Sequence, residues 1–159
     1  MSRTVHTLPT YNRCAVCGSP EVNPHTLHVR WLTDGETVWT EWTPQEAQMG
    51  YRGIVHGGIL CSLLDEGVGW AAALGVRKML ITGELTVRFL RPLPIGQPVR
   101  VCGYFGEDFR RYVTARGEVV DAAGVRYATA SGKFFPVPPE RVAEIASYLT
   151  VEEGDLAWW

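Results

Sequence analysis

The chain has 159 residues, of which 20% are charged and 46% hydrophobic, and its net charge is −2. This length predicts one domain with a sizeable core, and the composition excludes a disordered chain. The small negative charge gives no general attraction to nucleic acid or anionic membranes, so neither is expected as a partner. The first 24 residues contain no apolar stretch like that of a secretion signal, and we expect a cytoplasmic protein with reduced thiols.

Residues 1–26 are polar and aperiodic, and they predict an irregular N-terminal arm. The arm contains Cys14 and Cys17 in a Cys-x2-Cys pair, followed by His25 and His28. Zinc sites use this inventory, although the seven residues between the two pairs are fewer than usual. Two interpretations of the arm remain open, a zinc site and a packed, metal-free loop. We predict no metal for the catalytic residues described below.

Two segments that follow the arm alternate between polar and apolar residues, at 27–33 and 37–43. Asp34-Gly35 lies between them, which is a strong signal for a β-hairpin. Short turns also join the later alternating segments and predict antiparallel pairing. These later segments lie at 79–90, 99–105, 112–120 and 125–137.

The longest apolar stretch lies between the two groups of strands and predicts one helix over 57–74, with Gly75 as its C-cap. Its apolar run is too short to span a bilayer and carries two acidic residues. One helix that covers one face of a sheet of about five to six strands gives an α+β fold. We expect the main domain to cover 27–137, and a short helix and tail to follow at 138–159.

The helix carries two groups that suit carbonyl chemistry. Its start reads His56-Gly57-Gly58, where the first N–H groups have no internal acceptor and can polarise a carbonyl oxygen. Asp65 faces a stripe of small residues in mid-helix, where partial desolvation would suit a general base or nucleophile. Gly58 and Asp65 are about 10 Å apart along the axis, so one carbonyl cannot meet both from one helix. If both act on one substrate, two copies of the chain must share two sites.

A purely structural interpretation of the same residues also remains open. His-Gly-Gly is compatible with a tight turn into the helix, and Asp65 with a buried acid held by hydrogen bonds. Glu66 lies one position further round the helix, where we expect a solvated or salt-bridged side chain.

The motifs resemble those of one family. They are the segment from Gly50 to Ile59, the Leu63-Leu64-Asp65-Glu66 run, and the strand from Thr82 to Pro92. Together they closely resemble the PaaI-like hotdog-fold acyl-CoA thioesterases, over about residues 14–136. The resemblance implies an antiparallel sheet wrapped around one long helix. It also implies protomers that pair into a continuous sheet, as a homodimer or a dimer of dimers.

The resemblance implies roles for the site residues. Asp65 is implied to be the catalytic carboxylate, acting as base for water or as nucleophile. The Gly58 N–H polarises the thioester carbonyl with help from the segment around His56 and Gly57. Thr82 matches the hydroxyl that orients water or the acid.

The substrate implied is an acyl-CoA with an aromatic or medium-chain acyl group, and coenzyme A is part of it rather than a separate cofactor. Several members carry an amide shortly before the His, where this chain has Gly50, and Gln48 is a candidate replacement from the same loop. Because this amide is displaced, a non-catalytic acyl-CoA binding module or sensor is the alternative function. Four cations are candidates for binding the CoA phosphates: Arg88, Arg91, Arg110 and Arg111.

Overall fold

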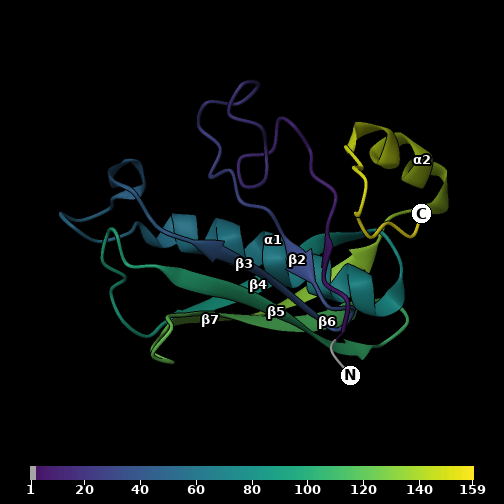
Figure 1. The fold of residues 1–159 in the computed structure, drawn as a ribbon. Helices are drawn as coiled ribbons and strands as arrows, with labels where there is room; N and C mark the ends of the chain where they lie inside the picture. The colour runs from purple at the N-terminus through teal and green to yellow at the C-terminus, as the bar shows by residue number, and fades with distance from the viewer. Residues whose placement is uncertain (1–2) are drawn as a thin grey trace.

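The computed structural model describes residues 3–159 and contains one antiparallel sheet with a long helix, α1 (Gly57–Val76), across it (Figure 1). Seven strands form the sheet in the order β1-β2-β3-β5-β6-β7-β4. The predicted α+β hotdog fold is therefore confirmed. The two short strands are β1 (His6–Thr7) and β2 (Leu32–Thr33). The long strands are β3 (Thr37–Trp42), β4 (Leu80–Phe89), β5 (Val99–Asp108), β6 (Val113–Val120) and β7 (Arg126–Pro136).

The core lies between α1 and the concave side of the sheet. Two glycines let helix and sheet approach closely, because a Cβ on Gly103 of β5 would lie 2.3 Å from the carbonyl oxygen of Gly67 in α1. On the same helix, a Cβ on Gly67 would meet the indole of Trp31, which is fully buried. By length and composition α1 could cross a membrane, but here it is the core helix of the fold. Leucine and alanine side chains fill the contact: Leu60, Leu63, Leu64, Ala71 and Ala72.

The predicted strand at 27–33 was wrong over most of its length. Only the last two residues pair with β3, because the preceding backbone turns towards the arm instead. The N–H of Leu27 donates to the oxygen of Ala15, and the N–H of Val29 donates to the oxygen of Val16. These bonds leave the arm as an additional layer over the sheet and α1. The predicted division of the chain at residues 26 and 137 stays a prediction.

The predicted helix end was also wrong. Gly75 continues the helix, and Arg77 is the C-cap in the left-handed conformation, with φ of 53°. Gly75 is needed for packing rather than for capping, since a Cβ there would lie 2.1 Å from the ring of Phe105.

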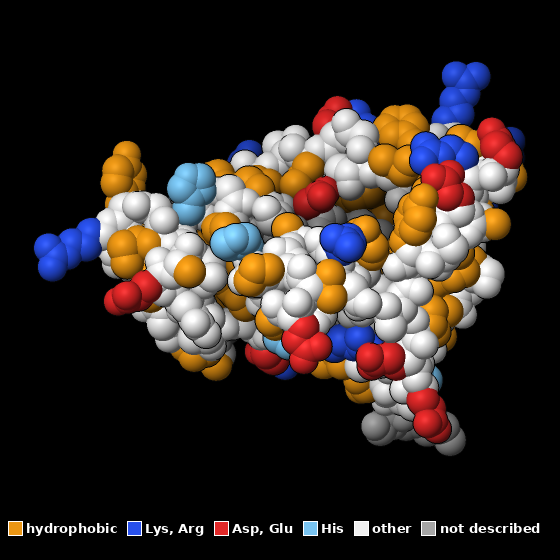
Figure 2. Space-filling model, turned by 90° about the horizontal axis from the view of Figure 1, so that it is seen from above, with side chains coloured by type: hydrophobic (Ala, Val, Ile, Leu, Met, Phe, Trp, Pro, Cys, Tyr) orange, Lys and Arg blue, Asp and Glu red, His pale blue; other side chains and the backbone are white. Residues whose placement is uncertain are grey.

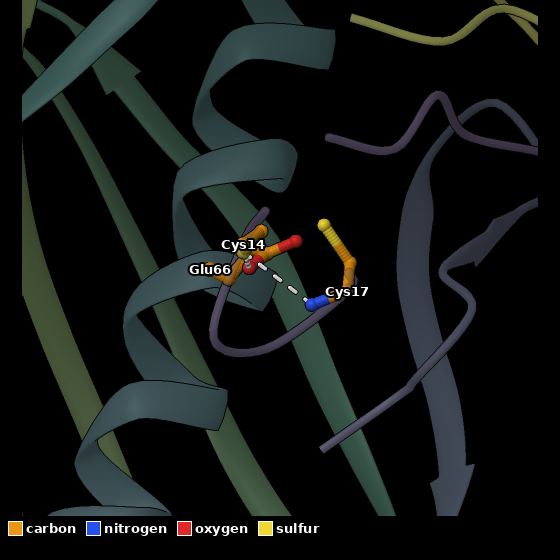
Figure 3. Close-up of side chains that lie close together, drawn as sticks. All are labelled: Cys14, Cys17 and Glu66. Carbon is orange, nitrogen blue, oxygen red and sulfur yellow. Dashed lines mark hydrogen bonds between the residues drawn. The ribbon is translucent and has the colours of Figure 1, made fainter. Parts of the chain in front are cut away.

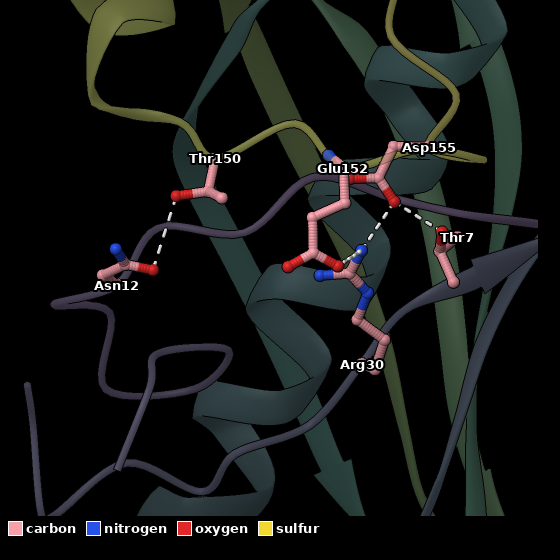
Figure 4. Close-up of polar contacts among 6 residues, drawn as sticks. All are labelled: Thr7, Asn12, Arg30, Thr150, Glu152 and Asp155. Atoms are coloured by element: carbon pink, nitrogen blue, oxygen red, sulfur yellow. Dashed lines mark hydrogen bonds and ion pairs between the residues drawn. The ribbon is translucent and has the colours of Figure 1, made fainter. Parts of the chain in front are cut away.

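The C-terminal segment returns to the N-terminal arm after α2 (Pro139–Tyr148) (Figures 1 and 4). Arg30 donates to Asp155 at 2.6 Å and to Glu152 at 3.3 Å. Thr7 also donates to Asp155, whose side chain is fully buried. These contacts hold the tail beside α1, where it can line a cavity.

Strand β4 is a long, open edge of the sheet. It pairs with β7 on one side, and no strand among residues 3–159 pairs with its other side. Ile81 and Phe89 on β4 are about half exposed, and so is Phe135 on the neighbouring strand. A ten-residue edge with apolar side chains is a template for pairing with another chain unless it is covered.

Candidate active site

The start of α1 is a closed turn. Nδ1 of His56 accepts a hydrogen bond from the N–H of Gly58 at 2.9 Å, so His56 is the N-cap of the helix. The N–H of His56 in turn donates to the oxygen of Gln48 at 2.8 Å. Gly50 lies against this turn, where a Cβ would be 2.9 Å from Cα of His56. The closeness of the turn leaves no room for a side chain at Gly50, the position at which the resemblance would place an amide.

The N–H of Gly57 lies beside this capped amide and is bonded to no acceptor among residues 3–159. The ring of Phe89 lies close to it, since a Cβ on Gly57 would be 3.1 Å from that ring. The helix start therefore offers one free N–H, at Gly57, and one that already has an acceptor, at Gly58.

Asp65 lies two turns further along α1 and lines a cavity of about 420 Å³. Its Oδ1 is buried and has no hydrogen-bond partner among residues 3–159. Thr82 of β4 lines the same cavity, so the structure brings these two predicted residues together. The other walls are mostly apolar and aromatic, with Trp70, Trp158 and Trp159 among them. Figure 2 shows hydrophobic side chains gathered around a hollow on the face that carries the arm and α2.

The helix start does not line this cavity. His56, Gly57 and Gly58 lie about two helical turns before Asp65 in the same chain. This separation agrees with the spacing argument from the sequence. The catalytic roles of these three residues, and those of Asp65 and Thr82, stay predictions.

Glu66 differs from what the sequence predicts, because it is neither solvated nor in an ion pair within the described chain. The indole N–H of Trp31 donates to its Oε1 at 3.1 Å, and the thiol of Cys14 donates to its Oε2 at 3.2 Å. Cys17 completes the cluster (Figure 3). Sequence reasoning missed this cluster, although an acid in an apolar helix and a Cys-x2-Cys pair were both visible signals.

The cluster is electrostatically unusual. Burial raises the pKa of the Glu66 carboxyl to about 8, and the neighbouring charge of Cys14 acts in the same direction. Hydrogen bonding to Cys17 lowers the pKa of Cys14 to about 5. The same contact, together with burial, raises the pKa of Cys17 above its ordinary value. Each of the three groups therefore affects the pKa of another.

The predicted substrate-binding residues lie outside the cavity. The side-chain oxygen of Gln48 accepts from the N–H of Gln45 at 2.7 Å, which leaves its amide NH₂ free of any partner in residues 3–159. Two of the four predicted arginines lie at the C-terminal end of β4, and the other two lie in the turn between β5 and β6. All of them are exposed, and none forms an ion pair in the described part of the chain: Arg88, Arg91, Arg110 and Arg111.

Residues 52–128 match the model of the thioesterase superfamily. A thioesterase superfamily protein of known structure is 29% identical, with a TM-score of 0.69 over 78% of this chain, which spans 60% of that protein's length. The Escherichia coli PaaI protein of the phenylacetic acid degradation operon is 19% identical, with a TM-score of 0.63 over 70% of this chain and 81% of its own. A Streptococcus mutans protein solved with acetyl CoA is 19% identical, with a TM-score of 0.60 over 64% of this chain and 82% of its own. No curated protein matches.

The architecture is that of a hotdog fold, and its segment 52–128 is similar to the thioesterase superfamily. The resemblance predicted from the sequence is confirmed by the match of residues 52–128 to the thioesterase superfamily model, and the PaaI structure shares the fold. The matched segment begins just before His56 and includes both Asp65 and Thr82.

Proposed function

We propose that this protein hydrolyses the thioester bond of an acyl-CoA with an aromatic or medium-chain acyl group. The observation that carries the proposal is Asp65, a carboxylate whose buried Oδ1 has no partner in the described residues 3–159 and which lines an apolar cavity together with Thr82. A buried oxygen without a hydrogen bond reduces stability, so its persistence at this position favours a catalytic task.

The reaction needs a carboxylate that acts as base or nucleophile, and an oxyanion hole, at the same carbonyl group. Asp65 takes a proton from water while the water oxygen attacks the thioester carbon, or attacks that carbon itself and is released by water afterwards. Thr82 orients the water or the carboxylate. The C–S bond then breaks, and the CoA sulfur leaves as thiolate and takes up a proton.

The oxyanion is stabilised by the start of α1 from a second copy of the chain. Two observations support this sharing. The helix start and Asp65 are about 10 Å apart along one axis. The β4 edge with its apolar side chains, such as Ile81, also suits pairing of two sheets into one. In the proposed dimer the free N–H of Gly57 approaches the carbonyl first, and the Gly58 N–H joins when His56 turns aside.

The cavity supports an apolar acyl group, because tryptophan side chains form much of its wall. CoA adds phosphates, which need cations outside the cavity. The exposed arginines without acidic partners, such as Arg88 and Arg91, suit that role. We place the reaction in the cytoplasm, where acyl-CoA esters and reduced thiols are both expected.

The test is an assay of the purified protein and its Asp65→Asn variant on a panel of acyl-CoA esters, with release of free thiol as the readout. We expect the variant to lose about 10²–10⁴-fold in kcat. Glu140→Gln is the matched control, since it also converts a carboxylate to an amide but lies on α2, outside the cavity. Full hydrolysis by a folded Asp65→Asn variant would overturn the assignment.

One observation favours the alternative, a non-catalytic acyl-CoA binding module. The N–H of Gly58, the predicted oxyanion donor, is already bonded to His56. Tight binding of acyl-CoA esters by calorimetry, without turnover of any member of the panel, would support this alternative.

A further inference from the structure

The cluster at Cys14, Cys17 and Glu66 joins the arm to the middle of α1. The two sulfur atoms and a carboxylate oxygen all lie within 4.8 Å of one another, and the Cys14 sulfur is 3.2 Å from Oε2 of Glu66. A tetrahedral zinc ion with Zn–S of about 2.3 Å and Zn–O of about 2.0 Å holds its ligand atoms roughly 3.5–3.8 Å apart. Small side-chain rotations would therefore place all three atoms on one ion.

The surroundings orient these atoms as ligands. The backbone N–H groups of Val16 and Cys17 donate to the sulfur of Cys14 at 3.3 and 3.4 Å, an arrangement that stabilises a thiolate. The indole of Trp31 holds the other carboxylate oxygen of Glu66, which leaves Oε2 directed at the cysteines. Outer partners of this kind fix the direction of metal ligands.

The turn that presents the cysteines is closed by glycine. The N–H of Gly18 donates to the oxygen of Cys14 at 3.0 Å, and a Cβ on Gly18 would lie 2.3 Å from that oxygen. Only a residue without a side chain fits there. The sequence Cys-x2-Cys-Gly thus builds a rigid loop with both sulfur atoms on one side.

A metal ion would bind the cluster in place of its thiol and carboxyl protons, with all three groups ionised. In residues 3–159 no lysine, arginine or histidine lies within 4.0 Å of Glu66, so no protein cation would offset their negative charge. Neutral protonated groups, or a disulfide between the cysteines, are the other ways to avoid this charge.

We propose that Cys14, Cys17 and Glu66 bind a thiophilic divalent cation of the zinc class. Two sulfur ligands select against magnesium and calcium, which prefer oxygen. The fourth position faces the cavity that Asp65 also lines and is filled by water, because Asp65 is outside the group of three. The ion fastens the arm to α1 and forms part of the cavity wall.

The ligand set differs from the one that the sequence left open. Nδ1 of His28 lies 3.1 Å from the oxygen of Gly18, and neither His28 nor His25 belongs to the group of three. Glu66 takes the place of the histidines, from a position 49 residues beyond Cys17 in the chain.

The test uses the full chain, stripped with a chelator and then titrated with Zn²⁺ or Co²⁺. We expect one equivalent per chain by elemental analysis, and intense sulfur-to-cobalt charge-transfer absorption with Co²⁺. Cys17→Ser should lose that absorption, and Glu66→Gln should weaken the affinity at least tenfold while keeping the fold by circular dichroism. Cys61→Ser is the matched control, because it removes a cysteine of α1 that lies outside the cluster.

Three outcomes would overturn the proposal. They are absence of bound metal in the wild type, unchanged metal binding in Cys17→Ser, and loss of metal in His25→Ala or His28→Ala but not in Glu66→Gln. An intact mass lower by two hydrogens in the freshly purified protein would identify a disulfide and also overturn it. If Cys17→Ser fails to fold, the cobalt spectrum of the wild type and the Glu66→Gln titration decide the question. All these readouts are independent of hydrolysis.

Discussion

Asp65 and Glu66 are neighbours in the chain, yet their carboxylates lie in different surroundings. The two side chains point about 100° apart around the helix. Asp65 faces the cavity with a buried oxygen that has no hydrogen-bond partner in residues 3–159, whereas both oxygens of Glu66 accept hydrogen bonds, from Trp31 and from Cys14. The comparison teaches that two acids next to each other in an apolar helix can have opposite hydrogen bonding. One carboxylate has an oxygen without a partner, as the proposed catalysis needs, and the other is held in place from two sides.

The largest expected effect tests whether Asp65 acts together with the helix start of its own chain or with that of a second chain. Gly57→Pro removes the free N–H at the first helical position, where proline is tolerated, and His56 before it already has an extended backbone. We expect Gly57→Pro and Asp65→Asn each to lose at least about 100-fold in kcat. Co-expressed and randomly paired, they should regain about a quarter of wild-type activity, since half the dimers then hold one intact site of two.

Gly57→Ala is the control for this experiment, because it keeps the N–H and adds only a methyl group near Phe89. A mixture that stays inactive, while both variants dimerise by light scattering, would mean that each site is built within one chain. The activity of Asp65→Asn expressed alone gives the background rate.

The second prediction concerns stability and separates the two acids directly. Glu66→Ala leaves the indole N–H of fully buried Trp31 without an acceptor, and the free energy of unfolding should fall by about 1–3 kcal/mol. Asp65→Ala removes an oxygen that has no partner in the part of the chain that the structure describes, so its free energy of unfolding should be unchanged or higher. Urea unfolding at one fixed protein concentration and pH checks both. A larger loss for Asp65→Ala than for Glu66→Ala would contradict the comparison.

Much of the fold follows from local sequence signals. Asp34-Gly35 marks the β2–β3 hairpin, and alternation marks the later strands, because period and turn chemistry act over a few residues. The segment at 27–33 was mispredicted since its backbone bonds to Ala15 and Val16 of the arm, a contact that no local pattern encodes. Gly75 was mistaken for a cap because its partner, Phe105, is thirty residues away.

The candidate site divides in the same way. The placement of Asp65 and of the glycines on one helix could be predicted, because helical rise and dipole are properties of one segment. The surroundings of Glu66 could not, since Cys14 and Trp31 reach it from parts of the chain that only the folded arm brings together. The sequence suggested histidines as partners of the cysteines, because they were the nearest suitable residues along the chain.

A third prediction concerns the cavity on the Asp65 side. Trp158 packs edge-on against Trp70 at 5.9 Å between ring centroids, and both line the cavity. Trp158→Ala should lengthen the space for the acyl group and raise kcat/KM for longer chains over shorter ones by about tenfold. The measurement is a chain-length series of acyl-CoA esters. Val151→Ala, which lies in the same tail but outside the cavity wall, is the control. Equal chain-length profiles for both variants would exclude a role of Trp158 in selecting the acyl group.

The smallest expected effect concerns Asp34, a carboxylate near solvent, and its contribution to stability at different pH values. Backbone N–H groups of Thr37 and Glu36 donate to Asp34, and these bonds lower its pKa, whereas burial raises the pKa of Glu66. A lowered pKa in the folded state stabilises the protein above the unfolded pKa, and this contribution is lost as the pH falls through the folded pKa. Asp34→Asn should therefore lower the melting temperature slightly at neutral pH and leave it unchanged in strong acid. Equal shifts at both pH values would mean that the carboxylate charge of Asp34 does not stabilise the hairpin.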